Sequence, residues 1–271
     1  MSIAPNAAID RLTVTAEKTV DITNEGTIQQ ITGTGSITLT GNGNVEIVSN
    51  ASVALQYAIN AKEKFEEAKT TGNLNWDTLI TAIHFYEEAK EIGAEVSSLT
   101  EYYSSIASLD LSEKSESNYD ISTGALVYFT GLTKLDLSKT GIKEIGGLVN
   151  LTDLETLDIS GNEIEDLGAL ANMSNLSELN ISNTSIKDIN VLVKEDTTTR
   201  FVDLINLQAQ NIPSLTSIAG LVHISINDVQ TDSVTWDFSG SVLAGTDAQN
   251  HIDQINATKD EASFIAPTVT Q

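Results

Sequence analysis

The sequence predicts an α/β solenoid with a small β domain in front of it and a cap at each end. Three observations carry this prediction. Leu and Ile recur at a spacing of 22 residues over three consecutive units, β-branched residues alternate in the first fifty residues, and a helical pattern lies between these two stretches. We expect four segments: 1–50, a small β-rich domain; 51–105, a helical hairpin and N-terminal cap; 106–221, the solenoid; 222–271, a β cap and polar tail.

Residues 10–50 read as short strands. Apolar pairs recur every eight or nine residues, and Gly and Asn fall between them, as in Gly33-Thr34-Gly35 and Gly41-Asn42-Gly43. The pairs are Val20 and Ile22, Ile28 and Ile31, Ile37 and Leu39, and Val45 and Ile47. This pattern predicts hairpins or a small β-roll. A sheet of this size is marginal alone, so we expect it to lean on a neighbouring domain or on another chain, as an anchor or assembly module.

Residues 51–105 change to helical periodicity. A first helix is expected to end near Thr71-Gly72, a second to follow Asn75 and stop around Gly93, and a third to run from about Ser97 to Ser105. Together they form a helical hairpin with a cap, which we expect to cover the first coil of the solenoid.

The central repeat is the most informative part of the sequence. Its shared form is LxxLx(L/I)xx(N/T)xIxx(I/L)xxL, and its three clean units begin at Leu132, Leu154 and Leu176. An irregular unit at Ile106, Leu109 and Leu111 precedes them, and a last unit is expected to follow an insertion. The positions expected for that last unit are Val202, Ile205, Leu207, Ile212, Leu215 and Ile218. One such coil cannot bury its own apolar side, so successive coils stack and their strands form a parallel sheet.

This pattern resembles the leucine-rich-repeat family, and the 22-residue unit is similar to its internalin-like class. The resemblance covers roughly residues 106–221. The family's Asn position holds Asn162 in one unit, and Thr140, Thr184 and Gln210 in the others. Thr and Gln side chains still bond to backbone groups, so we expect a weakened ladder of hydrogen bonds.

The resemblance implies a concave face formed by the side chains beside the strand leucines. The first expected column is Ser108, Lys134, Thr156, Glu178 and Leu204; the second is Asp110, Asp136, Asp158, Asn180 and Asn206; the third is Ser112, Ser138, Ser160, Ser182 and Gln208. We select nine of these as binding candidates: Asp110, Asp136, Asp158, Lys134, Glu178, Asn180, Ser138, Ser160 and Ser182.

Neighbouring strands lie about 4.8 Å apart, so three carboxylates would stack in a row on this face. A polar groove for a glycan, a cation or a basic peptide is one interpretation of that row. A solvated Asp column screened by salt is the other. No aromatic residue occupies these columns, which argues against a tight protein interface of the kind anchored by Tyr or Trp.

Residues 222–240 return to alternation, with Val222, Ile224 and Ile226 followed by Val234, Trp236 and Phe238. We expect a terminal hairpin or two edge strands there. A short helix near 247–258 fits the sequence, and the last residues are expected to form a tail.

Composition excludes several function classes. The net charge is −24 with a pI near 4.2, so nucleic acid and anionic membrane surfaces are not expected partners. No cysteine is present, which removes disulfides and thiolate chemistry. No apolar run reaches the roughly 18 residues of a membrane span, and the first residues do not resemble a signal peptide.

Catalytic, metal and cofactor sites are not predicted. The three histidines, His84, His223 and His251, lack metal-ligand spacing, and neither a phosphate-binding loop nor a nucleophile elbow occurs. We therefore expect no enzyme and no cofactor.

The sequence favours a non-catalytic binding or adhesion protein that displays a recognition surface on a cell or particle surface. Its partner would be a protein or glycan ligand. Two alternatives fit the same sequence. One is a structural protein of a bacteriophage virion, such as a decoration, spike or fibre component, which docks on other subunits through residues 10–50. The other is an intracellular scaffold or regulator.

Overall fold

The structure is a computed structural model. It describes residues 2–14, 19–33, 35, 37–42, 44–113, 123–192, 204, 206–218, 234–244, 248–258, 262–265 and 268–270. The chain divides into two compact units, Met1–Tyr102 and Tyr103–Gln271. Each unit has its own buried core and is described separately.

The first unit begins with two three-stranded sheets in which every pair of strands is parallel. One sheet holds β1 (Ser2–Ile3), β3 (Val20–Asn24) and β5 (Ile37–Thr40), and the other holds β2 (Ala8–Thr13), β4 (Thr27–Thr32) and β6 (Asn44–Ser49). Parallel pairing excludes the hairpin alternative, because a hairpin joins antiparallel strands. The strands form a small roll, in which the chain alternates between the two sheets.

The roll has an apolar interior and tight corners. Ile22 of one sheet and Ile28 and Ile31 of the other are at most 1% exposed, so isoleucines from both sheets form the core of the roll. Gly33 has a φ of +106°, and a Cβ at this position would lie 2.1 Å from the carbonyl oxygen of Val14. Only glycine fits this corner, because any side chain would collide with the preceding coil.

Three helices complete the first unit: α1 (Ala51–Thr71), α2 (Trp76–Glu91) and α3 (Ser97–Ser104). Asn50 links the roll to α1. Its Oδ1 accepts the N–H groups of Ser52 and Val53, and its Nδ2 donates to the carbonyl oxygens of Gly33 and Gly35. The helix therefore begins at a residue fixed by the last turns of the roll. The helices match the predicted segments, and their role as a cap of the solenoid stays a prediction.

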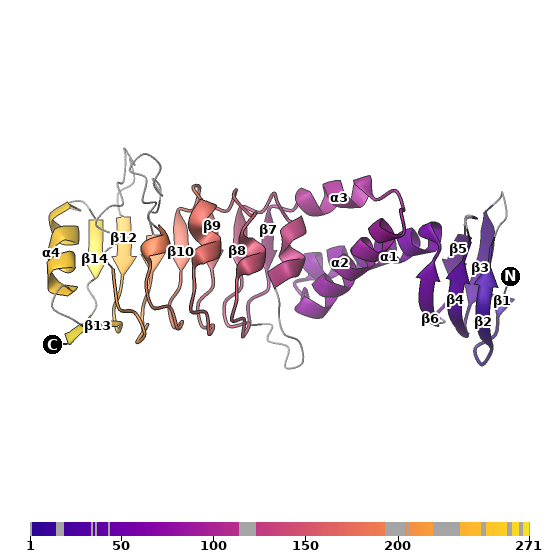
Figure 1. Ribbon diagram of the computed structural model, residues 1–271, viewed down its shortest axis with the longest axis horizontal. Helices are drawn as coiled ribbons and strands as arrows, with labels where there is room; N and C mark the ends of the chain where they lie inside the picture. Colours follow the sequence, from indigo (N-terminus) through magenta and orange to yellow (C-terminus); the bar gives the residue numbers. More distant parts are fainter. Residues whose placement is uncertain are drawn as a thin grey trace. The chain divides into compact units, whose positions relative to one another are not determined.

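The second unit is built on a seven-stranded sheet in which every pair of neighbouring strands is parallel. The strands follow chain order, as Figure 1 shows, and β13 belongs to another sheet. Its strands are β7 (Ser108–Asp110), β8 (Lys134–Asp136), β9 (Thr156–Asp158), β10 (Glu178–Asn180), β11 (Asn206–Gln208), β12 (Val234–Asp237) and β14 (Ala262–Ile265). Short 3₁₀ helices follow the turns: η1 (Thr123–Tyr128), η2 (Gly146–Leu148), η3 (Gly168–Asn172) and η4 (Asn190–Leu192). The repeated Leu and Ile positions are buried between sheet and helices, with Leu135, Leu157 and Leu179 at most 2% exposed.

The last unit of the repeat has a different register from the one expected. Leu207 pairs with Leu179 and Gln208 with Asn180, so Leu207 holds the central strand position. The N–H of Asn183 donates to the carbonyl of Gln210, which places Ile212 and not Gln210 beside Thr184. The insertion before this unit is therefore two residues longer than the pattern indicated. Val202 and Ile205 lie outside the described residues.

The C-terminal segment also differs from the expectation. β12 lies between β11 and β14 and pairs in parallel with both, so it is neither an edge strand nor part of a hairpin. Trp236 is fully buried, and its Nε1–H donates to the carbonyl of Leu204, which extends the core by another coil. The helix expected near 247–258 is α4 (Ala248–Thr258). Residues 222–226 lie outside the described part of the chain.

The polar tail expected at the end of the chain is corrected as well. β14 continues the large sheet, and β15 (Thr268–Thr270) pairs with β13 (Val242–Ala244) in parallel. The partners of parallel strands come from distant parts of the sequence, so the local sequence pattern does not predict such short strands.

Candidate functional site

The exposed face of the large sheet carries the side chains that alternate with the buried leucines. We call this surface the outer sheet face and define it by three columns that cross β7 to β11. The register pairs Lys134 with Thr156 and Thr156 with Glu178, and it pairs Asp136 with Asp158. The 22-residue spacing therefore predicted the neighbours correctly from β8 to β10.

The first column contains Ser108, Lys134, Thr156, Glu178 and Asn206. Lys134 and Glu178 are exposed, and Thr156 and Asn206 are partly exposed. Leu204, which the sequence placed here, is fully buried instead. The correction follows from the register of β11, which brings Asn206 beside Glu178.

The second column contains Asp110, Asp136, Asp158, Asn180 and Gln208, and Asp237 continues it on β12. Gln208, which the sequence placed in the third column, lies in the second because of the register of β11. The Asp and Asn side chains of this column close the turns after their strands. In each case Oδ1 accepts the backbone N–H two residues later in the chain. The bonds are Ser112 to Asp110 at 2.9 Å, Ser138 to Asp136 at 2.9 Å, Ser160 to Asp158 at 2.8 Å, Ser182 to Asn180 at 3.1 Å and Ser239 to Asp237 at 2.8 Å. A short side chain with an oxygen at this position satisfies a backbone donor that the ending strand leaves unpaired.

The third column contributes further bonds to the same turns. The hydroxyl groups of Ser112 and Ser160 donate to Asp110 and Asp158, both at 2.6 Å. Ser182 is only 4% exposed, and its Oγ accepts the N–H of Gln210 from the next coil. The pKa of Asp237 is lowered. Partial burial raises this pKa, but the hydrogen bonds from the Ser239 N–H, the Ser239 hydroxyl and the Gln210 amide together lower it by more.

Behind the outer sheet face, the buried Asn162 joins two coils by hydrogen bonds. Its Oδ1 accepts the N–H groups of Thr140 and Gly141, and its Nδ2 donates to the carbonyls of Leu137 and Ile159. Thr140 and Thr184 each donate a hydroxyl to a carbonyl of their own coil, as expected for a weaker ladder. These buried bonds keep neighbouring strands in register and make the face rigid.

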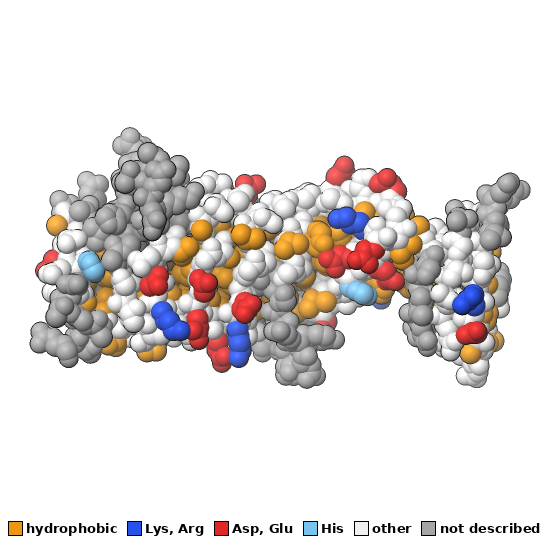
Figure 2. Space-filling model, in the orientation of Figure 1, with side chains coloured by type: hydrophobic (Ala, Val, Ile, Leu, Met, Phe, Trp, Pro, Cys, Tyr) orange, Lys and Arg blue, Asp and Glu red, His pale blue; other side chains and the backbone are white. Residues whose placement is uncertain are grey.

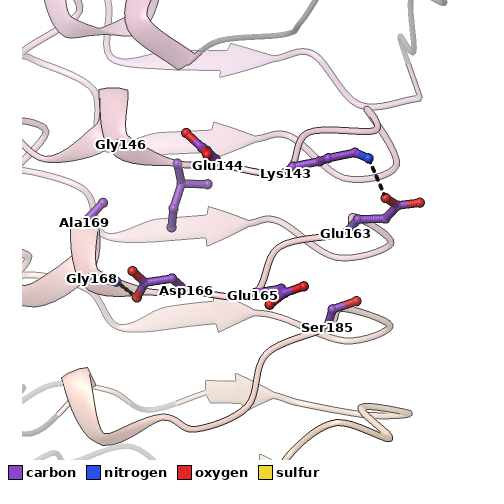
Figure 3. A pocket seen from close by; sticks show the side chains of 10 residues that line it. Lys143, Glu144, Gly146, Glu163, Glu165, Asp166, Gly168, Ala169 and Ser185 are labelled. Atoms are coloured by element: carbon purple, nitrogen blue, oxygen red, sulfur yellow. Dashed lines mark hydrogen bonds and ion pairs between the residues drawn. The ribbon is translucent and has the colours of Figure 1, made fainter.

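A second surface lies where the chain runs from the turns to the 3₁₀ helices. It is a hollow of about 810 Å³ formed by three successive coils (Figure 3). Its lining includes the charged residues Lys143, Glu144, Glu163, Glu165 and Asp166, together with Gly146 and Gly168. No sequence motif marks this surface, because its members come from different coils.

Most charges around the hollow have a partner within the protein. Lys143 pairs with Glu163 at 3.0 Å and Lys187 with Glu165 at 2.5 Å. Asp166 accepts the N–H of Gly168 at the start of η3 at 2.7 Å, a bond drawn in Figure 3. Figure 2 shows basic and acidic side chains interspersed over this part of the repeats. The hollow is therefore lined by groups that stabilise the coils themselves.

The histidines are dispersed. His84 is exposed on α2, His251 is partly exposed on α4, and His223 lies outside the described residues. Within the described ranges, no group of three or more His, Asp or Glu side chains is placed to hold a metal ion. The same part of the chain contains no helix that is both long and apolar enough to cross a membrane.

Comparison with known proteins identifies the repeat. The family model described as Leucine Rich repeats (2 copies) matches residues 130–172 and residues 155–194. Residues 130–194 are leucine-rich repeats. This confirms the resemblance that the spacing predicted, and it agrees with the parallel register of β8 to β10. No curated protein sequence matches the chain.

The solved structures that are similar to this chain include proteins of two bacteria. An internalin C2 of Listeria monocytogenes is 21% identical, with 61% of this chain and 62% of that chain covered and a TM-score of 0.43. An internalin of the same species is 17% identical over 97% of this chain and 82% of that one, with a TM-score of 0.49. A leucine-rich-repeat protein of Leptospira interrogans is 12% identical over 88% and 54%, with a TM-score of 0.47. The chain thus spans less than two thirds of the internalin C2 chain.

Proposed function

We propose that this protein is a non-catalytic binding module that holds a protein ligand on the outer sheet face. One observation carries the proposal. The face is a continuous parallel sheet whose side chains from β8 to β10 are exposed or partly exposed and set at regular intervals on a rigid ladder of hydrogen bonds. A rigid face loses little conformational entropy on binding, so even short polar side chains can give useful affinity.

A protein ligand fits this face better than a small molecule does. The outward columns of β7 to β11 contain Ser, Thr, Asn, Gln and charged side chains and no aromatic ring. A glycan is usually held by stacking on aromatic side chains, and a small ligand needs a concave pocket. A glycan ligand remains the second candidate, and the polar columns support it through their hydrogen-bonding capacity.

A site-specific cross-link tests the face. A photoreactive residue at the exposed Ser108 lies at the β7 end of the outer sheet face, and the same residue at the exposed Asn172 on η3 is the matched control. We expect a cross-linked protein partner from position 108 and none from position 172. Excess unlabelled protein should compete for that partner, whereas Thr156→Trp, which blocks the face, should not. Equal adducts from both positions would contradict the proposal.

We propose further that the module is displayed on a cell or particle surface as an adhesion protein. A net charge of −24 keeps such a protein soluble and away from nucleic acid, and a chain without cysteine does not depend on the redox state outside the cell. The roll at residues 2–49 supports the virion alternative, because its strands belong to small sheets that suit docking on other subunits.

Fractionation of the producing culture separates these locations. An antibody against the repeats is used on cytosol, envelope and sedimented particles. Signal in the envelope supports a cell-surface adhesin, and signal in the particles supports a virion component. Signal confined to the cytosol overturns both and favours the intracellular scaffold.

A further inference from the structure

The charges on the outer sheet face fall into two groups. The carboxylates of Asp110, Asp136 and Asp158 each accept a backbone N–H of the turn that follows their strand, and Asp158 also accepts a hydrogen bond from Asn180 at 2.9 Å. These bonds point the carboxylates at their own chain. A ligand that recruited them would have to compete with the turns, so their main role is structural.

Lys134 and Glu178 form the second group. Both side chains are exposed, and neither makes a hydrogen bond or an ion pair within the part of the chain that the structure describes. They occupy the same column, with only Thr156 between them. Two strand spacings separate them, which is about 10 Å. The first column therefore offers one positive and one negative charge at a fixed distance.

We propose that these two residues set the specificity of the face. The ligand is a protein segment that places a carboxylate against Lys134 and a Lys or Arg side chain against Glu178, with about 10 Å between the two charges. This inference rests on the proposed function and adds to it the chemistry of the partner. Complementary charge at two fixed points selects one register of the partner and rejects segments in which both charges have the same sign.

A selection experiment with a defined probe tests the charges. A displayed library of random peptides is selected against the full chain and against three variants: Lys134→Glu, Glu178→Lys and the double variant Asp136→Asn with Asp158→Asn. Binders that also bind Thr156→Trp are removed at each round. Circular dichroism first establishes that every variant is folded.

The expected result is a change of ligand charge that follows the substitution. Peptides selected on the wild type should carry one acidic and one basic residue, those selected on Lys134→Glu two basic residues, and those on Glu178→Lys two acidic residues. Wild-type peptides should lose at least about tenfold in affinity on either reversed variant. The Asp136→Asn, Asp158→Asn variant should select the same peptides as the wild type.

Three outcomes count against these statements. If every peptide that binds the wild type also binds Thr156→Trp, so that the removal step leaves no binder, the outer sheet face is not a binding surface and the proposed function fails. If face-dependent peptides appear but their charges do not follow residues 134 and 178, the proposed function stands and the charge inference is wrong. If the selected peptides bind the wild type but not the Asp136→Asn, Asp158→Asn variant, the ligand contacts the Asp column, and the assignment of specificity to Lys134 and Glu178 is wrong.

Discussion

At the residue scale, an aspartate at the end of a strand explains much of the outer sheet face. After β7, β8, β9, β10 and β12 the chain has a donor that the sheet does not pair, and a short carboxylate or amide two residues earlier in the chain accepts that donor. A hydrogen bond to a charged acceptor is stronger than one to a neutral acceptor. A row of carboxylates is therefore compatible with a stable coil without any bound cation.

Substitution of Asp136 tests this role. Asp136→Ala should lower the free energy of unfolding by about 1 kcal/mol, because the N–H of Ser138 loses its acceptor. Asp136→Asn keeps an oxygen at that position and should stay within about 0.5 kcal/mol of the wild type. Urea denaturation followed by circular dichroism measures both. A stability gain in both variants would show that repulsion along the column outweighs the turn bonds.

Asp237 predicts a dependence of stability on pH. Its pKa is lowered in the folded protein, since the bonds from Ser239 and Gln210 outweigh partial burial. The unfolded chain therefore binds the proton more readily, and stability from this group is present above its ordinary pKa of 3.8 and is lost as the pH falls through the lower folded pKa.

The comparison with Asp237→Asn isolates that group. The variant does not titrate at this position, so the difference in melting temperature between wild type and variant should shrink as the pH drops below 3.8. Melting curves between about pH 3 and pH 7 measure it, within the range where ordinary carboxyl groups titrate. A constant difference over this range would mean that the bonds to Asp237 do not depend on its charge.

At the scale of the element, one buried amide fixes the register of two coils more firmly than a hydroxyl does. Asn162 makes bonds to both its own coil and the preceding one, whereas Thr184 donates only to Ile181 of its own coil. Neighbouring strands are joined at this point by side-chain bonds in addition to the ladder between their backbones.

Substitutions at Asn162 and Thr184 should lower the free energy of unfolding by different amounts. Asn162→Ala leaves several buried backbone groups without a partner and should cost about 3 kcal/mol or more. Thr184→Val removes a single hydroxyl bond and should cost about 1 kcal/mol. Chemical denaturation of the two variants checks the order. Equal losses would indicate that water replaces the amide of Asn162.

The sequence predicts elements well where the repeat keeps its period and poorly where it does not. The register from β8 to β10 follows from the 22-residue spacing, because each coil repeats the same path. After Leu192 the strand partners are 28 and 29 residues apart, and the expected register of the last unit was wrong. A signal was nevertheless present: Trp236-Asp237-Phe238-Ser239 repeats Leu157-Asp158-Ile159-Ser160, with Trp in place of Leu and Phe in place of Ile.

The candidate site was predictable in position but not in chemistry. Alternation along a strand places Lys134 and Asp136 on one face. Whether a carboxylate there faces solvent or accepts a backbone N–H depends on the geometry of the turn after the strand. The same amino-acid sequence is compatible with either arrangement. That is why the sequence grouped Asp136 with Lys134 as binding candidates, while the hydrogen bonds separate them.

At the scale of the whole molecule, the acidity of the chain follows in part from its repeated architecture. Two successive coils each have two places where an acidic or amide side chain accepts a backbone N–H, one at the end of the strand and one before the 3₁₀ helix. Asp158 and Asp166 fill them in one coil, and Asn180 and Asp188 in the next. Three of these four acceptors are aspartates that bond to their own chain, so the net charge alone does not identify a basic partner.

The two compact units predict a localised response to damage in the core. Leu157 is 1% exposed at the centre of the sheet, and Leu157→Asp would bury a charge among leucines. We expect residues 103–271 to lose protection of their amides from hydrogen exchange, because each coil is stabilised by its neighbours. Residues 2–49 should keep their protection, since the interior of the roll, with Ile22, Ile28 and Ile31, belongs to the other unit.

Hydrogen exchange measured by mass spectrometry on the full chain gives the protection of both units in one experiment, with Leu157→Ile as the control for side-chain shape. Loss of protection throughout the chain would show that the roll depends on the repeats for its stability, and unchanged protection in both units would refute the register that buries Leu157.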